Sequence, residues 1–220
     1  MGDSRCRFLN LSAMSELPRA TVERLPQYLR LLDDIGEARI TISSEQLAEA
    51  SGANAANVRR DLLYLDFHGM RGVGYSIEEL RARIRDELGI SHRRNVAIVG
   101  AGNLGRALAN YGGLARRGFD VAAIYDRDEE KVGTSIGDLV IHPIDSLAND
   151  LVGGLFDMAI LAVPGNAAQQ VTDVLVKWGI SSILNFAPVR VDVPDSVYVR
   201  QVDLSMELQV LSYYGDRPRS

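Results

Sequence analysis

The stretch Asn95-Val-Ala-Ile-Val-Gly-Ala-Gly-Asn-Leu-Gly105 decides the fold of the second half of this 220-residue chain. Its apolar run, residues 96–99, predicts a buried parallel strand. Gly100, Gly102 and Gly105 follow with the spacing GxGxxG. In such a motif the first glycine permits a tight turn, the second lets the backbone approach a pyrophosphate, and the third lets a helix pack on the strand. We therefore expect a dinucleotide site between this strand and a helix.

The residues after this stretch alternate between strand and helix patterns. Such alternation predicts an α/β domain of the Rossmann type, a doubly wound parallel sheet with helices on both faces. The expected strands span residues 96–99, 120–125, 139–142, 156–162, 181–184 and 197–201, and the expected helices span residues 103–117, 144–151, 165–178 and 203–214.

Asp126 ends the second expected strand, 21 residues beyond Gly105. A carboxylate at this place accepts hydrogen bonds from the adenosine ribose hydroxyls and repels a 2′-phosphate, which favours NAD(H) over NADP(H). Arg127 beside it weakens that preference. The alternative interpretation is that Asp126 only caps a turn.

Ligands of doubly wound sheets bind at the carboxyl ends of the strands. Val163-Pro164 and the run Asn185 to Pro188 end two later strands, although ordinary turn chemistry could also explain these residues. The expected cofactors are NADH and NAD⁺, and the expected contacts are Gly100, Ala101, Gly102, Asn103, Leu104, Gly105, Tyr111, Asp126, Val163, Pro164, Asn185, Phe186, Ala187 and Pro188.

The first half of the chain has the pattern of a winged helix-turn-helix domain. Residues 18–35 predict an amphipathic helix that Pro26 should kink or restart. Helices at 45–50 and 54–65, separated by a Ser-Gly turn, form the helix-turn-helix pattern. The glycine-rich run 69–75 predicts a two-stranded wing, and a helix at 77–88 follows.

The second of these short helices would enter the major groove of DNA with its first residues. Arginine suits guanine and asparagine suits adenine, while serine N–H groups hold phosphates and a wing arginine reaches the minor groove. The alternative is a small helical domain with a solvated arginine face. The expected DNA contacts are Ser43, Ser44, Asn54, Asn57, Arg59, Arg60 and Arg71.

Composition separates the two halves. The net charge of −5 falls entirely after residue 94, because 14 arginines balance 14 acids before it. The arginines keep DNA binding open despite a pI near 5.3. Cys6 is the only cysteine, so we expect no disulfide and no cysteine-based zinc site. With no signal peptide and no run of about 18 apolar residues, a cytoplasmic protein is expected, and we expect no metal.

The sequence offers no constellation for catalysis. Dehydrogenation needs a positioned acid or base, and the three histidines, His68, His92 and His142, form no such pair. The residues after the last strand are too few for a substrate domain. We therefore expect a sensor and no enzyme. The alternatives are an NAD-dependent oxidoreductase with an N-terminal helical domain and a CoA-binding or ligase-type Rossmann domain.

Taken in order, these motifs resemble the bacterial Rex repressors, which sense the NADH/NAD⁺ balance. The resemblance covers roughly residues 18–214 and rests on Gln27-Tyr28-Leu29-Arg30, Ser43-Ser44-Glu45-Gln46-Leu47, Val58-Arg59-Arg60-Asp61-Leu62, Arg71-Gly72-Val73-Gly74-Tyr75, Val99 to Ala109, Asn185-Phe186-Ala187-Pro188 and Val202-Asp203-Leu204.

The resemblance implies a homodimer that binds inverted-repeat operator DNA when it is empty or holds NAD⁺, and that lets go when NADH binds. It implies that the helix Asp203 to Tyr214 is domain-swapped between subunits. Arg30 and Asp203 match positions that form a state-dependent ion pair. Tyr111 matches an aromatic residue near the nicotinamide, although Gly112-Gly113 follows it where many members have Pro-Gly.

The motifs also divide the chain. We expect a disordered tail over residues 1–17, a DNA-binding domain over 18–90, an NAD(H)-binding domain over 95–202, the swapped helix over 203–214 and a tail over 215–220.

Overall fold

The computed structural model describes residues 17–35 and 39–215. The chain divides into two compact units between Ser91 and His92, inside the polar connector that follows the first set of helices. Cys6 and nearly all of both expected tails lie outside the described residues. No helix in the described ranges combines the length and the apolar composition that a membrane crossing requires.

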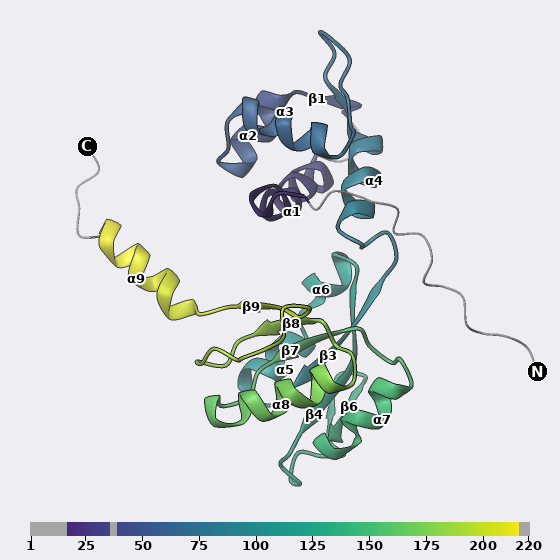
Figure 1. The fold of residues 1–220 in the computed structure, drawn as a ribbon, viewed down its shortest axis with the longest axis vertical. Helices are drawn as coiled ribbons and strands as arrows, with labels where there is room; N and C mark the ends of the chain where they lie inside the picture. Colours follow the sequence, from purple (N-terminus) through teal and green to yellow (C-terminus); the bar gives the residue numbers. More distant parts are fainter. Residues whose placement is uncertain (1–16, 36–38, 216–220) are drawn as a thin grey trace, which may run out of the picture. The chain divides into compact units, whose positions relative to one another are not determined.

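The first unit is a small helical bundle with one short antiparallel strand pair (Figure 1). Its elements are α1 (Arg19–Asp34), β1 (Thr41–Ile42), α2 (Ser44–Ser51), α3 (Ala55–Tyr64), β2 (Tyr75–Ser76) and α4 (Ile77–Glu87).

Side-chain caps explain where three of these helices begin. Ser43, Asn54 and Ser76 each accept a hydrogen bond from the backbone N–H three residues further on, which satisfies a donor that the helix itself leaves free. Gln46 completes a capping box by accepting the N–H of Ser43. Gly52 ends α2 in the left-handed conformation, with φ of 63°.

Helix α1 runs without interruption through Pro26, so the expected restart is wrong. Pro26 is exposed, and Val22, whose carbonyl the missing N–H would have bonded, is 41% exposed. Water can therefore replace the lost hydrogen bond on this side of the helix. Val22 does not face the core, contrary to the helical pattern of the sequence.

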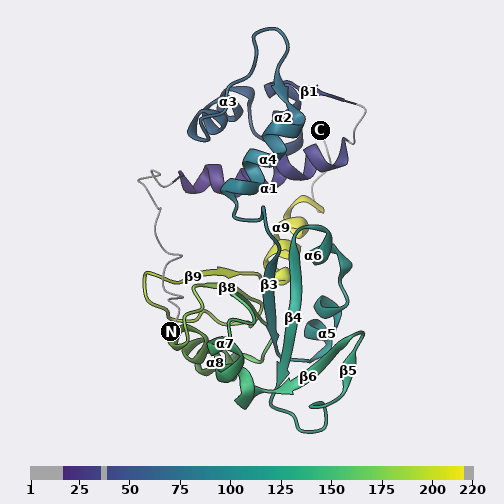
Figure 2. The ribbon, with the colours of Figure 1, turned by 90° about the vertical axis from the view of Figure 1, so that its right-hand side faces the viewer.

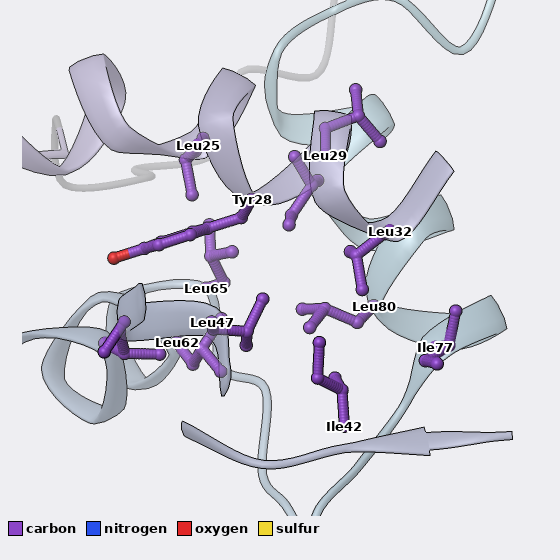
Figure 3. Close-up of a cluster of buried hydrophobic side chains, with 13 residues drawn as sticks. Leu25, Tyr28, Leu29, Leu32, Ile42, Leu47, Leu62, Leu65, Ile77 and Leu80 are labelled. Carbon is purple, nitrogen blue, oxygen red and sulfur yellow. The ribbon is translucent and has the colours of Figure 1, made fainter. Parts of the chain in front are cut away.

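Thirteen apolar residues form the core of the first unit (Figure 3). Helix α1 contributes Leu25, Tyr28, Leu29 and Leu32, and these side chains pack against residues of the other helices and of β1. The remaining members are Ile42, Leu47, Ala48, Val58, Leu62, Leu65, Ile77, Leu80 and Ile84.

A buried carboxylate joins α1 to α3. Asp61 is 1% exposed, and its two oxygens accept hydrogen bonds from Thr21 Oγ1 at 2.8 Å, from Arg24 Nη2 and Nε at 2.7 Å each, and from Tyr28 Oη at 2.8 Å. Burial alone would raise the pKa of Asp61, but these donors outweigh burial and hold that pKa below its ordinary value. Burial and the bond to Asp61 raise the pKa of Tyr28 to about 12.

The wing is less regular than the expected two-stranded ribbon (Figure 2). Only Met70 and Gly74 bridge to each other across the hairpin, whereas the regular pairs are Thr41 with Ser76 and Ile42 with Tyr75. Gly74 has φ of 104°, and a Cβ there would lie 2.5 Å from the Ile42 carbonyl oxygen. The short strand before α2 thus holds the base of the wing, a pairing that the sequence did not predict.

The second unit is the predicted doubly wound sheet. Its elements are β3 (Arg94–Val99), α5 (Asn103–Ala109), α6 (Gly112–Arg116), β4 (Phe119–Asp126), β5 (Ser135–Ile136), β6 (Leu139–Pro143), η1 (Ile144–Ser146), α7 (Leu147–Val152), β7 (Met158–Leu161), α8 (Gly165–Lys177), β8 (Ser182–Asn185), β9 (Tyr198–Gln201) and α9 (Leu204–Gly215).

In the described residues the strands lie in the order β5-β6-β4-β3-β7-β8-β9. All neighbours from β6 to β9 pair in parallel, and their order is the 3-2-1-4-5-6 arrangement of dinucleotide-binding domains. Only β5, which was not expected, pairs antiparallel with β6. The direction of winding reverses between β3 and β7, where a crevice is expected in such sheets.

Alternate residues of β3 bury on opposite faces of this sheet. Ala97 and Val99 pack in a cluster with residues of α7 and α8, whereas Val96 and Ile98 pack in a cluster that α5 and α6 cover. Because both faces are covered, the strand reads as a continuous apolar run.

The expected helix over residues 103–117 is two helices. Helix α5 ends at Ala109, and Tyr111 has an extended backbone, with ψ of 93°, before α6 begins at Gly112. The phenol ring of Tyr111 lies over Gly113, where an added Cβ would come within 2.3 Å of the ring. Two consecutive glycines also weaken a helix at this place.

The turn between β3 and α5 depends on the spacing of its glycines. Gly100 has φ of 105°, and a Cβ on Gly105 would lie 1.8 Å from the Gly100 carbonyl oxygen. Gly102 has φ of −75°, and a Cβ there would meet no protein atom within 4 Å. The structure thus requires glycine at positions 100 and 105, while position 102 stays free of protein atoms.

We predict that Gly105→Ala lowers the free energy of unfolding by about 3 kcal/mol or more, because a backbone oxygen occupies the space of the new methyl group. Thermal unfolding measures the change. Gly102→Ala is the matched control and should keep the melting temperature of the wild type. Equal melting temperatures for the two variants would contradict the packing described here.

We predict that Asp61→Asn costs about 3–5 kcal/mol of stability, because Arg24 then lacks its buried counter-charge. Since the folded pKa of Asp61 is lowered, its contribution is complete above its ordinary pKa of 3.8 and is lost as the pH falls through the folded pKa. Urea unfolding at several pH values should therefore show a shallower acid slope for Asp61→Asn than for the wild type. Arg19→Gln, which removes an exposed pair with Glu23 on the same helix, should change little.

Candidate functional site

A cleft of about 1120 Å³ opens at the carboxyl ends of the strands of the second unit, beside the point where the winding reverses. Eight of the fourteen residues expected to contact a cofactor line it, namely Gly100, Gly102, Asn103, Leu104, Asp126, Val163, Pro164 and Phe186. The open space over Gly102 and the absence of a side-chain cap on α5 leave the backbone there accessible to a ligand.

Asp126 holds the glycine turn in place. It is 9% exposed, and its Oδ2 accepts the N–H of Ala101 at 2.7 Å while its Oδ1 accepts the N–H of Asp128 at 2.9 Å. Lys131 Nζ lies 3.4 Å from Oδ2. Burial raises the pKa of Asp126, but the two backbone donors and Lys131 outweigh it, so the pKa is lowered and the group is an anion at neutral pH.

The other six expected cofactor residues do not line the cleft. Ala101 and Gly105 are buried beneath the turn, and Tyr111 is 55% exposed and packs on Gly113. Asn185 is fully buried. Its amide donates to the Val189 carbonyl and to the side chain of Gln201, and its Oδ1 accepts the N–H of Ala187. Asn185 therefore shapes the loop that carries Phe186, Ala187 and Pro188.

Sequence reasoning missed much of the cleft lining, although it noted Arg127. The missed residues come from η1, α7 and α8 and from the loop after β4, namely Asp128, Lys131, Ile144, Asp145, Leu147, Ala148, Ala167, Gln170, Val171, Val174, Lys177 and Trp178. One feature of the sequence could have pointed there, because its only two lysines, Lys131 and Lys177, both line this cleft.

Among the described residues, no histidine or cysteine lines the cleft. The exposed ring of His142 lies tilted against the ring of Tyr125, with centroids 5.9 Å apart. The Tyr125 hydroxyl in turn donates to Asp150 at 2.8 Å. Within the described ranges, His, Cys, Asp and Glu form no group that could hold a metal ion. The chemistry of the lining suits the binding of a polar nucleotide through backbone N–H groups and carboxylates.

The expected DNA-reading residues lie around the turn between α2 and α3. Arg60 is exposed and forms no hydrogen bond or ion pair with the described residues. Arg59 instead donates to Ser44 Oγ at 2.8 Å and to Glu45 at 3.2 Å. Arg71 is exposed on the wing. Of these three arginines, Arg60 and Arg71 are the ones without a hydrogen-bond or ion-pair partner in the part of the chain that the structure describes.

Two of the remaining residues expected to contact DNA cap the helices α2 and α3. The side chains of Ser43 and Asn54 accept cap hydrogen bonds, Ser44 is 7% exposed, and Asn57 is half-buried. Ser43 and Asn54 thus stabilise the ends of the helices that would approach a phosphate backbone.

Arg30 and Asp203, the residues expected to form an ion pair, belong to different units. Arg30 is exposed on α1, and Asp203 is exposed just before α9. The hydroxyl and the backbone N–H of Ser205 both donate to Asp203 and lower its pKa. The pair itself stays a prediction.

Helix α9 exposes many apolar side chains. None of its residues is buried, and its large exposed side chains are Leu204, Met206, Leu208, Val210, Leu211, Tyr213 and Tyr214. An exposed apolar surface of this kind is typical of an interaction site.

Comparison with known sequences covers both units. The sequence pattern described as "CoA binding domain" matches residues 91–189, and the one described as "Putative DNA-binding protein N-terminus" matches residues 16–62. The chain is 49% identical over 202 residues to the redox-sensing transcriptional repressor Rex of Streptomyces avermitilis, which covers 91% of this chain and 80% of that protein. It is 41% identical over 199 residues to Rex of Desulfitobacterium hafniense, covering 90% of this chain and 95% of that protein.

Solved structures agree with the fold. RSP, a Rex-family repressor, matches with a TM-score of 0.82 and 34% identity over 92% of this chain and 95% of that one. RSP in complex with β-NAD⁺ and operator DNA gives a TM-score of 0.85, and RSP in complex with β-NADH gives 0.81. The predicted resemblance and fold class are confirmed by these matches. The chain belongs to the Rex family of redox-sensing transcriptional repressors.

Proposed function

We propose that this chain represses transcription by binding operator DNA when its cleft is empty or holds NAD⁺, and that it leaves the DNA when NADH binds. The observation that carries this proposal is the cleft over Gly102, where backbone N–H groups and the anionic Asp126 lie together. RSP, a relative of the same fold, has been crystallised with both forms of this cofactor. Membership in a repressor family makes turnover of a substrate unnecessary.

The response requires that the two forms of the cofactor favour different conformations of the protein. A ligand shifts a conformational equilibrium only through unequal affinity for the two states. The oxidised nicotinamide ring is a planar cation, while the reduced ring is neutral and puckered. Desolvation beside an apolar side chain disfavours the cation. We assign this contact to Phe186, the aromatic residue at the carboxyl end of β8 that lines the cleft.

Tyr111 can contact the nicotinamide only after its side chain moves. In this structure it packs on Gly113 and does not line the cleft. The interruption of the helix between α5 and α6 determines the position of the Tyr111 side chain. In the proposed complex the Tyr111 ring therefore leaves Gly113 to contact the nicotinamide.

On the DNA side we assign base contacts to Arg60 and Asn57 on α3 and a minor-groove contact to Arg71. Arg60 is free to form the paired hydrogen bonds that guanine offers. Ser43, Ser44, Asn54 and Arg59 then hold the phosphate backbone. Half-sites on DNA have a fixed separation, so a small rotation of one subunit against the other abolishes simultaneous binding.

We propose that α9 joins two copies of the chain. All seven of its large apolar side chains are exposed, and a large exposed apolar surface marks a site of interaction. A second copy of the chain covers the apolar side chains of α9, because an inverted-repeat operator requires two DNA-binding units. Arg30 and Asp203 would pair in only one arrangement of the two copies.

The first test measures operator release. The full-length protein should shift an inverted-repeat promoter fragment in a gel equally well with NAD⁺ and without ligand. NADH should weaken that binding by about 5- to 150-fold, the usual range of allosteric coupling. Arg60→Ala should weaken DNA binding with an unchanged affinity for NADH, because it touches only the DNA side. Identical DNA affinities with saturating NAD⁺ and NADH would refute the proposed function.

The second test concerns assembly. Leu208→Asp places a charge among the apolar side chains of α9. The mass of this variant, measured by sedimentation equilibrium, should fall from that of two chains toward one chain of 24.1 kDa. Glu207→Ala, on the same exposed helix, should leave the dimer intact. If Leu208→Asp keeps the mass of two chains, another surface joins the subunits.

A further inference from the structure

The wall of the cleft beside Asp126 carries balanced charge. Two carboxylates, Asp126 and Asp128, and two cations, Arg127 and Lys131, line it. Lys131 Nζ lies 3.4 Å from Asp126 Oδ2 and 3.2 Å from Asp128 Oδ2. A 2′-phosphate at this wall would therefore meet a site of zero formal net charge, in which Lys131 adds to the effect already expected of Arg127.

Asp126 has little hydrogen-bonding capacity left for a ribose. A carboxylate offers about four acceptor positions. The N–H groups of Ala101 and Asp128 take two of them, and Lys131 takes a third. Asp126 can therefore accept from one ribose hydroxyl, and a second hydroxyl requires another partner.

Lys131 is held where it can be that partner. Its backbone N–H donates to the Asp128 carbonyl at 3.0 Å, and its carbonyl accepts the Thr134 hydroxyl at 2.6 Å. Its side chain is 34% exposed. An ammonium group has three donors, and the two carboxylates occupy two of them. One N–H of Lys131 is left for a ligand in the cleft.

We propose that Lys131 contacts the adenosine ribose and determines how strongly the site rejects a 2′-phosphate. The proposal rests on the proposed binding of NADH in this cleft. Asp126 alone would repel the phosphate of NADPH, and Lys131 offsets this repulsion by neutralising one carboxylate and donating to the phosphate. Removing the ammonium group should make the protein more selective for NADH over NADPH.

The chain supplies matched controls. Lys177 is the only other lysine, lines the same cleft, and lies 5.7 Å over the ring of Trp178. Arg127 lines the wall next to Asp126 and forms no hydrogen bond or ion pair with the residues that the structure describes. Lys177→Gln tests loss of charge elsewhere in the cleft, and Arg127→Gln tests the neighbouring cation.

The experiment titrates NADH and NADPH separately into the full-length wild type, Lys131→Gln, Lys177→Gln and Arg127→Gln at one fixed ionic strength. Calorimetry reports both dissociation constants. For Lys131→Gln, the Kd of NADPH should rise about tenfold or more through loss of a charge-assisted contact, while the Kd of NADH stays within about threefold. Lys177→Gln should leave the ratio of the two constants unchanged.

Three outcomes would overturn the assignment. The two constants of Lys131→Gln could rise equally, which would give Lys131 only a supporting role in the loop. They could both stay unchanged, or the ratio could respond to Arg127→Gln alone. Failure of the wild type to bind NADH at all is a different result, because it refutes the proposed function and not the role of Lys131 within it.

Discussion

Helix α5 can follow strand β3 only because Gly105 carries no side chain. Any Cβ at this position would lie inside the van der Waals surface of the Gly100 carbonyl oxygen. This close approach sets the angle at which the helix leaves the sheet, and it leaves the backbone at Gly102 open to the cleft. The turn lines the cleft together with Asp126 and Phe186, and the Ala101 N–H of the turn donates to Asp126.

Each unit also relies on one buried carboxylate that accepts several hydrogen bonds. Asp61 accepts four hydrogen bonds from three side chains of α1, and it thereby fixes the helix proposed to read DNA. Asp126 accepts two backbone N–H groups that define the glycine turn and its neighbour. Losing a partner of a buried anion is strongly destabilising. Both carboxylates therefore stabilise the fold next to a proposed binding site.

Local motifs made much of the fold and part of the site predictable. The six strands expected after residue 94 appear within two residues of their expected ends, because apolar runs and glycine turns are recognisable over short stretches of sequence. The loop residues Gly100 to Leu104 and Asp126 follow from the same motif. Asn185 shows the opposite case, because its place at a strand end suggested a ligand contact. Its amide is instead fully used by Val189, Gln201 and Ala187.

By itself, the sequence determined the order of the elements, the helix caps and the glycine turn, since each depends on residues that are close along the chain. Only the tertiary structure decided which distant groups meet. Thr21 and Asp61 are 40 positions apart, and no periodicity reveals that a charged residue of α3 is buried against α1. The break at Tyr111, the presence of Lys131 and residues of α8 in the cleft lining, and the pairing of β1 with β2 have the same origin. Each arises from packing between separate elements, where burial and the matching of donors to acceptors outweigh local propensity.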